Sequence, residues 1–163
     1  MRSAAVVVVA AFVLVAGVGP AAAQSKPLEM DCTSGAYLEQ GSIEVKLDGG
    51  TLHFIQHAPA SDFLDPKVDH ARAPSEKEWK DLRRTLDAVD FWNWKTNYEI
   101  PDAVAGRYWS VTVRYADRSA SVHGRNAWPG DEDPATVSKT PTKRYERLRA
   151  TIQALVGSGY PFQ

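Results

Sequence analysis

Residues 42–57 read SIEVKLDGGTLHFIQH, and they predict a β-hairpin. In the first half of this stretch apolar and polar residues alternate, which is the pattern of a strand with one buried face. The sequence Asp48-Gly49-Gly50 follows, and these residues tolerate the positive φ angles of a tight hairpin turn. We therefore expect two antiparallel strands, one on each side of this turn, with their apolar side chains on the same face.

A similar hairpin is expected over residues 109–125. Aromatic and β-branched residues alternate with polar ones from Trp109 to Tyr115, so this stretch also has the period of a half-buried strand. Residues 116–118 supply the turn, and residues 119–125 return as the partner strand.

Each hairpin is followed by a loop and an amphipathic helix. The first helix opens at Ser75, which can form a capping box with Glu78. The second opens at Thr140-Pro141, a cap followed by a first-turn proline, and Gly157 ends it. Apolar residues at helical spacing give each helix one face for the core.

The two halves align at a constant offset of 66 positions, which predicts an internal repeat of residues 42–91 and 108–157. The alternative is that any two amphipathic helices resemble each other. One hairpin with one helix has too little core to be stable alone. We therefore expect an α+β domain over residues 42–163, with a four-stranded antiparallel sheet and both helices on one face. Residues 58–73 are expected to form a loop.

The first 23 residues have the order of a signal peptide. Arg2 precedes an apolar run, and small residues end at Ala23, so we expect cleavage there and export to the periplasm or beyond. The alternative, a retained anchor, is disfavoured because the run of about 15 residues is shorter than the ~20 that cross a bilayer as a helix. No membrane span is expected after cleavage.

Residues 24–41 are expected to form a polar tether that ends in a short strand around residues 36–38. The chain has one cysteine, Cys32, so it cannot form an internal disulfide. Acidic residues stand before Cys32 where a lipid-attachment site needs small ones, which favours a free thiol over a lipid anchor.

The charge balance argues against two classes of partner. Without Arg2 the chain carries 18 Lys and Arg against 20 Asp and Glu. Nucleic-acid binding requires a basic excess for phosphate contacts, and adsorption to anionic lipid requires a basic patch. We expect neither.

The face of the sheet away from the helices is the candidate working surface. Alternation along the strands places His53, His57 and His123 on this face. His53 and His57 are about 13 Å apart at ~3.3 Å per residue, so they cannot both bind one zinc ion. The alternative is a site that combines one of them with His123 from a neighbouring strand and Glu44. We expect no metal and no cofactor.

The stretch HGRNAWPG at residues 123–130 is the most distinctive in the chain. Gly124 allows a close approach, Asn126 can bond the backbone two residues on, and Trp128-Pro129 can close the corner against the core. A structural turn and a ligand-binding turn are both consistent with this pattern. The candidate binding residues are His53, His57, His123, Arg125, Asn126 and Trp128.

This part of the chain resembles small exported bacterial proteins of unassigned activity. The shared features are the aromatic strand Trp109-Ser-Val-Thr-Val113, the Gly124-x-Asn126-x-Trp128-Pro129 turn and a closing amphipathic helix. The resemblance covers roughly residues 79–156 and implies kinship of fold, without an activity.

We find no catalytic signature, since Gly-x-Ser-x-Gly is absent and Gly49-Gly50 is followed by a strand rather than by a phosphate-binding helix. The sequence favours a non-enzymatic binding domain of the cell envelope that takes a protein or a small ligand. The alternatives are a small hydrolase with His123 or His57 as base, and an assembly protein that pairs through its sheet.

Overall fold

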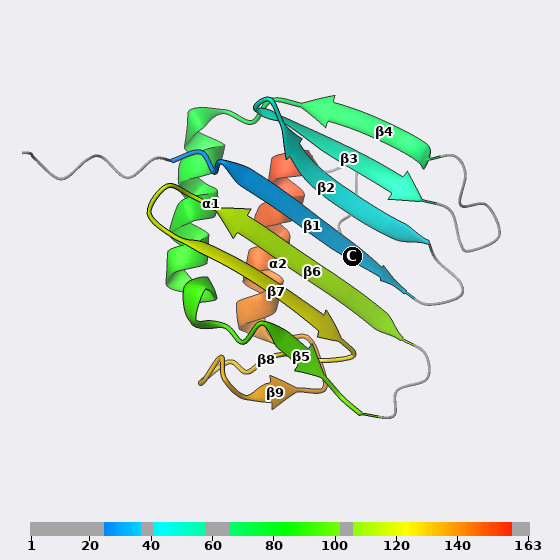
Figure 1. Ribbon diagram of the computed structural model, residues 1–163, viewed down its shortest axis with the longest axis vertical. Coiled ribbons are helices and arrows are strands. Elements are labelled where there is room, and N and C mark those ends of the chain that lie inside the picture. The colour runs from blue at the N-terminus through cyan, green and yellow to red at the C-terminus, as the bar shows by residue number, and fades with distance from the viewer. Residues whose placement is uncertain (1–24, 37–40, 58–65, 102–105, 158–163) are drawn as a thin grey trace, which may run out of the picture.

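The computed structural model describes residues 25–36, 41–57, 66–101 and 106–157. The expected signal peptide and its cleavage site lie outside these ranges. The described residues form two layers, a seven-stranded sheet and a pair of helices behind it (Figure 1). The strand order of the large sheet is β4-β3-β2-β1-β6-β7-β5, and β5 is parallel to β7 while all other neighbours are antiparallel.

The large sheet contains β1 (Glu29–Ala36), β2 (Ser42–Asp48), β3 (Thr51–His57), β4 (Pro66–Arg72), β5 (Asn97–Glu99), β6 (Arg107–Arg114) and β7 (Ser119–Arg125). A two-stranded sheet pairs β8 (Trp128–Pro129) with β9 (Val137–Ser138). The helices are α1 (Glu76–Ala88), the short 3₁₀ helix η1 (Phe91–Asn93) and α2 (Lys143–Val156).

The expected four-stranded antiparallel sheet is wrong. Both expected hairpins are present, as β2–β3 and β6–β7, but they do not pair with each other. Strand β1 lies between them and pairs with β2 on one side and β6 on the other. Two further strands, β4 and β5, extend the sheet at its two edges.

Strand β1 comes from residues 24–41, the segment expected to be a tether. Met30 and Cys32 point into the core and are 1% and 0% exposed, and Cys32 stands opposite Val45 and Val111. The sequence signal was weak because only these two apolar residues alternate with acidic ones before the strand turns polar at Ser34. A buried strand between two strongly apolar ones needs little apolar content of its own.

Strand β4 comes from residues 58–73, which were expected to form a loop. Its first residue is Pro66, and its position at the edge of the sheet tolerates a residue without an N–H group. Arg72, the last residue of β4, donates to the carbonyl oxygens of Ala154 and Leu155 at the end of α2, at 3.2 and 3.0 Å. The edge strand is thereby fastened to the helix layer.

The start of α1 is as predicted. The Glu78 amide donates to the Ser75 hydroxyl at 3.3 Å, and the Ser75 amide donates to the Glu78 carboxylate at 2.7 Å, which completes the capping box. For α2 the predicted start is two residues early, because the N-cap is Thr142 rather than Thr140. The Thr142 hydroxyl accepts from the Tyr145 amide and donates to the Pro129 carbonyl at 2.8 Å.

The helices cover one face of the large sheet, as the alternation predicted. The inward strand residues that the sequence identified are buried: Ile43, Val45, Leu52, Phe54, Trp109, Val111, Val113 and Val122. Leu47 and Ala120 are partly buried against the same core. The two helices meet at Thr85 and Thr151, whose hydroxyl oxygens are 3.1 Å apart. The internal repeat stays a prediction.

No described helix is long and apolar enough to cross a membrane.

Candidate functional site

The three histidines of the hypothesis share the uncovered face of the sheet. His53 and His57 lie on β3, and His123 lies on β7. All three belong to the outward set, because their neighbours Phe54 and Val122 are buried under the helices. We call this polar face, formed by the outward residues of β1–β3 and β5–β7, the open face.

The histidines do not form a cluster. Strands β2, β1 and β6 lie between β3 and β7, so four strand spacings of ~4.8 Å, about 19 Å in all, separate His123 from the other two. The idea that His123 stands on a strand next to His53 or His57 is therefore wrong. Among the described residues, no group of three His, Cys, Asp or Glu side chains could hold a metal ion.

A groove of about 350 Å³ lies on the open face where β5, β7, β6 and β1 meet. The parallel pairing of β5 with β7 places Asn97 beside His123 and Glu99 beside Arg125. The Arg125 guanidinium is 3.9 Å from the Glu99 carboxylate. The groove is lined by Thr33, Asn97, Glu99, Tyr108, Trp109, Ser110, His123, Gly124 and Arg125.

Sequence reasoning found two residues of this groove, His123 and Arg125. It missed Thr33 and the two residues of β5 because neither β1 nor β5 was expected to be a strand. The alternation of Glu29, Met30, Asp31 and Cys32 was the one signal that could have revealed β1.

The other two residues of the predicted turn, Asn126 and Trp128, do not line this groove. Asn126 has a φ of 51°, its side chain accepts from the Arg107 amide at 2.9 Å, and its own amide donates to the Arg107 carbonyl at 2.9 Å. The side chain thus bonds to the backbone of β6. Trp128 is 6% exposed and packs against Tyr145 on the helix side of the sheet.

The close approach expected at Gly124 is confirmed. A Cβ atom at this position would lie 2.3 Å from Nε1 of Trp109 and 2.5 Å from the Ala127 carbonyl oxygen. The same indole nitrogen donates to that carbonyl at 2.9 Å. The absence of a side chain at Gly124 lets the Trp109 ring pass over β7 and donate this bond.

The open face carries more acidic than basic groups. Its described carboxylates belong to Glu29, Asp31, Glu44, Asp48 and Glu99, and its Lys and Arg side chains to Lys46, Arg114 and Arg125. Partial burial raises the pKa of Asp31, and the nearby Glu44 carboxylate raises it further, against the opposing effect of Lys46. The centre of the open face is therefore a place where an added cation would be favoured.

The hydrolase hypothesis requires a histidine within hydrogen-bond reach of Ser, Asp or Cys. In the described part of the chain the His123 imidazole has no hydrogen-bond partner, and the contact of His57 is with Glu44, at 3.5 Å. Cys32 is a free thiol buried in the core, and burial raises its pKa well above the usual range. In the described part of the chain, neither His57 nor His123 therefore has the Ser, Asp or Cys partner that this hypothesis requires.

No protein-family model matches this chain, and no curated protein shows significant similarity to it.

Proposed function

We propose that the chain is an exported, non-enzymatic binding domain of the cell envelope that holds a protein partner against the open face. The observation that carries this proposal is a whole sheet face that no described element covers (Figure 1). Its side chains are polar or charged with the exception of Ile55 and the Tyr108 ring, and polar surfaces of this kind occur at non-obligate interfaces.

The size of the face favours a protein over a small molecule. The six strands of the open face lie ~4.8 Å apart and have three to eight residues each, at ~3.3 Å per residue, which gives a surface of roughly 600 Å². One partner of a standard protein–protein interface contributes ~800 Å². The groove around His123 and Arg125 would then receive one anchoring side chain of the partner.

The charge of the face favours a partner with a basic surface. Acidic groups exceed basic ones on the open face, and Glu44 and Asp31 repel each other at its centre. A Lys or Arg from the partner would relieve this repulsion and form charge-assisted hydrogen bonds.

Site-directed photo-cross-linking in the cell envelope tests the proposal. A photoreactive residue at Ser121, on the open face, is expected to trap one partner, whereas the same residue at Arg147, exposed on α2, is expected to trap none. The isolated chain should have the mass of residues 24–163, as cleavage after Ala23 requires.

Charge variants supply the control for specificity. Asp31→Asn combined with Glu44→Gln is expected to reduce cross-linking several-fold, while Glu76→Gln on α1 leaves it unchanged. The proposal would be contradicted if the same protein were trapped from both faces, or if the Asp31→Asn, Glu44→Gln protein were cross-linked as strongly as the unchanged chain. A full-length chain retained in the cytosol would also contradict it. Trapping of a second copy of this chain would assign the face to self-assembly instead.

A further inference from the structure

The core side of the sheet becomes polar at one end. Along β6 the inward residues are Val113, Val111 and Trp109, and the next inward position is Arg107. Along β1 the inward row likewise passes from Cys32 to Ser34, which is paired with Trp109. Arg107 is exposed at the end of β6, whereas Ser34 is a buried polar residue.

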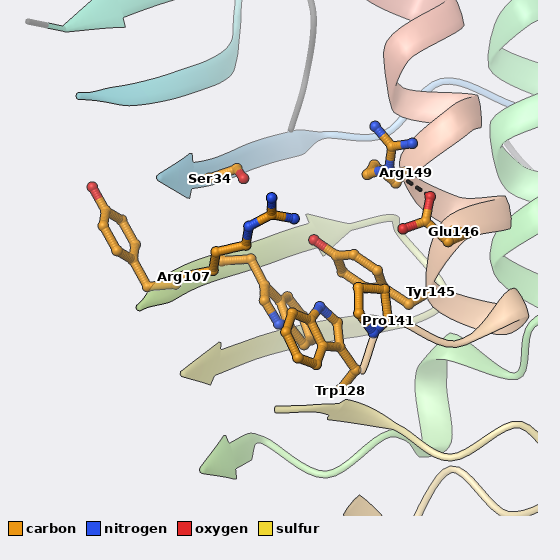
Figure 2. A pocket seen from close by; sticks show the side chains of 9 residues that line it. Ser34, Arg107, Trp128, Pro141, Tyr145, Glu146 and Arg149 are labelled. Atoms are coloured by element: carbon orange, nitrogen blue, oxygen red, sulfur yellow. Dashed lines mark hydrogen bonds and ion pairs between the residues drawn. The ribbon is translucent and has the colours of Figure 1, made fainter. Parts of the chain in front are cut away.

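A cavity of about 390 Å³ lies at this end, between the sheet and the first turns of α2 (Figure 2). We call it the helix-side cavity. Ser34 and Arg107 face it from the strands, and Tyr145, Glu146 and Arg149 face it from α2. Tyr108, Trp109, Trp128 and Pro141 complete its lining. Its volume is within the range of small-molecule sites.

We infer that the helix-side cavity binds a small organic acid, a single carboxylate on a flat apolar body such as an aromatic ring. This site is separate from the open face, which is on the other side of the sheet. The inference does not rest on the proposed function.

The charges of the cavity select a monoanion. The Arg107 guanidinium has no acidic partner among the described residues, whereas Nε of Arg149 donates to the Glu146 carboxylate at 2.7 Å. Among the described residues that line the cavity, two guanidinium groups and one carboxylate leave one net positive charge. A guanidinium binds a carboxylate through two parallel hydrogen bonds, so Arg107 supplies a directional anchor for one carboxylate.

Three aromatic rings form the apolar part of the cavity wall, and each presents only a small part of its surface to the cavity. Trp109, Trp128 and Tyr145 are 2%, 6% and 5% exposed, and the Tyr145 ring centroid is 4.9 Å from that of Trp109 and 6.3 Å from that of Trp128. The indole of Trp109 is fixed by its hydrogen bond to Ala127. These rings are therefore held in place before a ligand arrives, which lowers the entropic cost of binding.

Tyr145 adds a neutral donor beside the guanidinium groups. Burial and the nearby Glu146 carboxylate raise the pKa of the Tyr145 hydroxyl well above its usual range, so it stays protonated at neutral pH. A protonated phenol can donate to a carboxylate, whereas a phenolate would repel it.

The experiment titrates the mature chain with benzoate and with benzamide, its uncharged analogue of the same shape. Indole N–H resonances in ¹⁵N-labelled protein report on Trp109 and Trp128, and calorimetry gives the affinity. We expect saturable binding of benzoate, with shifts confined to those two of the five tryptophans, and at least tenfold weaker binding of benzamide.

Two variants are expected to act in opposite directions. Arg107→Gln should weaken benzoate binding at least tenfold, and Glu146→Gln should strengthen it several-fold because it removes the competing carboxylate. Arg147→Gln, an exposed position on the same helix that does not line this cavity, is the control and should change nothing.

Several results would overturn the inference: equal affinities for benzoate and benzamide, unchanged affinity in Arg107→Gln, or no shift of the two indoles. Circular dichroism of each variant confirms that the fold is intact before titration. The Asp31→Asn, Glu44→Gln protein should bind benzoate normally, so the failure of either proposal is seen independently of the other.

Discussion

Individual charged residues at the centre of the open face can lower the stability of the fold. Asp31 is the clearest example, because partial burial and the Glu44 carboxylate both disfavour its charged form and raise its pKa. An acid whose pKa is raised in the folded state contributes stability below its unfolded pKa, and this contribution is lost as the pH rises through the folded pKa. At neutral pH the ionised Asp31 is therefore a destabilising group.

We expect Asp31→Asn to raise the urea midpoint at pH 7, and the gain to disappear at pH 3, where Asp31 is protonated in both states. Asp81→Asn is the matched control with the opposite sign, since Lys77 lowers the pKa of Asp81 and its removal should lower the midpoint at pH 7. A lower midpoint for Asp31→Asn at pH 7 would show that its attraction to Lys46 outweighs the other effects.

At the scale of elements, those with their own strong local signal were predicted. Both hairpins have alternating apolar residues, the first has turn glycines, and α1 has a complete capping box, so their positions follow from neighbouring residues alone. Strands β1, β4 and β5 have no such signal. Their conformation depends on partners that are distant in sequence, for example Val111 opposite Cys32.

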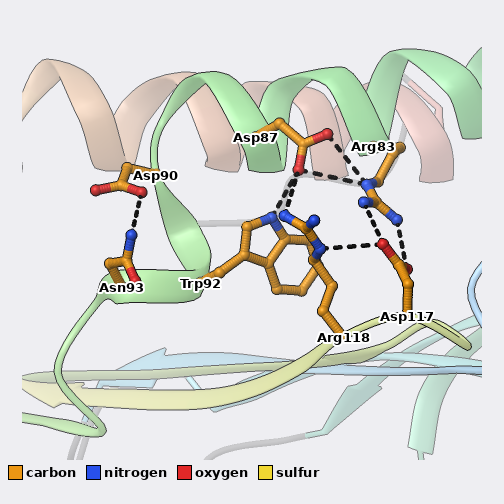
Figure 3. A network of polar contacts seen from close by, with 7 residues as sticks. All are labelled: Arg83, Asp87, Asp90, Trp92, Asn93, Asp117 and Arg118. Carbon is orange, nitrogen blue, oxygen red and sulfur yellow. Dashed lines mark hydrogen bonds and ion pairs between the residues drawn. The ribbon is translucent and has the colours of Figure 1, made fainter.

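One side chain joins three of these elements. The Arg83 guanidinium on α1 donates to Asp117, in the β6–β7 turn, at 2.9 and 2.8 Å, and its Nε donates to Asp87 at 3.1 Å (Figure 3). It also lies over the rings of Tyr115 and Trp92, 4.8 and 5.5 Å from their centroids. The Arg83 guanidinium thus connects α1, the 3₁₀ helix η1 and the β6–β7 hairpin.

Arg83→Lys is expected to lower the free energy of unfolding by about 1 to 3 kcal/mol at pH 7, because lysine keeps the charge but loses the two-pronged bond and the stacking. Arg84→Lys is the control, since Arg84 is 75% exposed in its pair with Asp81 and should change stability little. Urea denaturation of both proteins measures the difference.

The effect of Arg83→Lys should also depend on pH. Arg83 lowers the pKa of Asp117, so the loss of unfolding free energy in Arg83→Lys should shrink as acid protonates this carboxylate. Equal effects of the two substitutions would contradict this role for Arg83.

At the scale of the whole molecule, the insertion of β1 explains both what was predicted about the site and what was not. Alternation within each hairpin was sufficient to place His53, His57 and His123 on one face. The distance between them depends on the strand that separates the hairpins, and no pattern within either hairpin contains that information. The groove at His123 was missed for the same reason, since β1 and β5 supply part of its wall.

The same insertion leads to a prediction about folding. Strand β1 provides all the strand pairing between the β2–β3 and β6–β7 hairpins, and it buries Met30 and Cys32 between them. A chain that begins at residue 41 would expose two long sheet edges and the apolar row beneath them. We expect this chain to lose cooperative unfolding in urea and the dispersed amide spectrum of a packed core. A chain that begins at Ser25 keeps β1 and should unfold cooperatively in urea.

Complementation separates the loss of pairing from general damage by truncation. A synthetic peptide of residues 25–36 should bind the truncated chain and restore the cooperative transition, because it supplies both rows of backbone hydrogen bonds. A peptide with Met30→Asp and Cys32→Asp should fail, since it would place two carboxylates in the core. If the chain from residue 41 still unfolds cooperatively by itself, the two hairpins can pair directly with each other, and the central position of β1 is not what holds the two halves together.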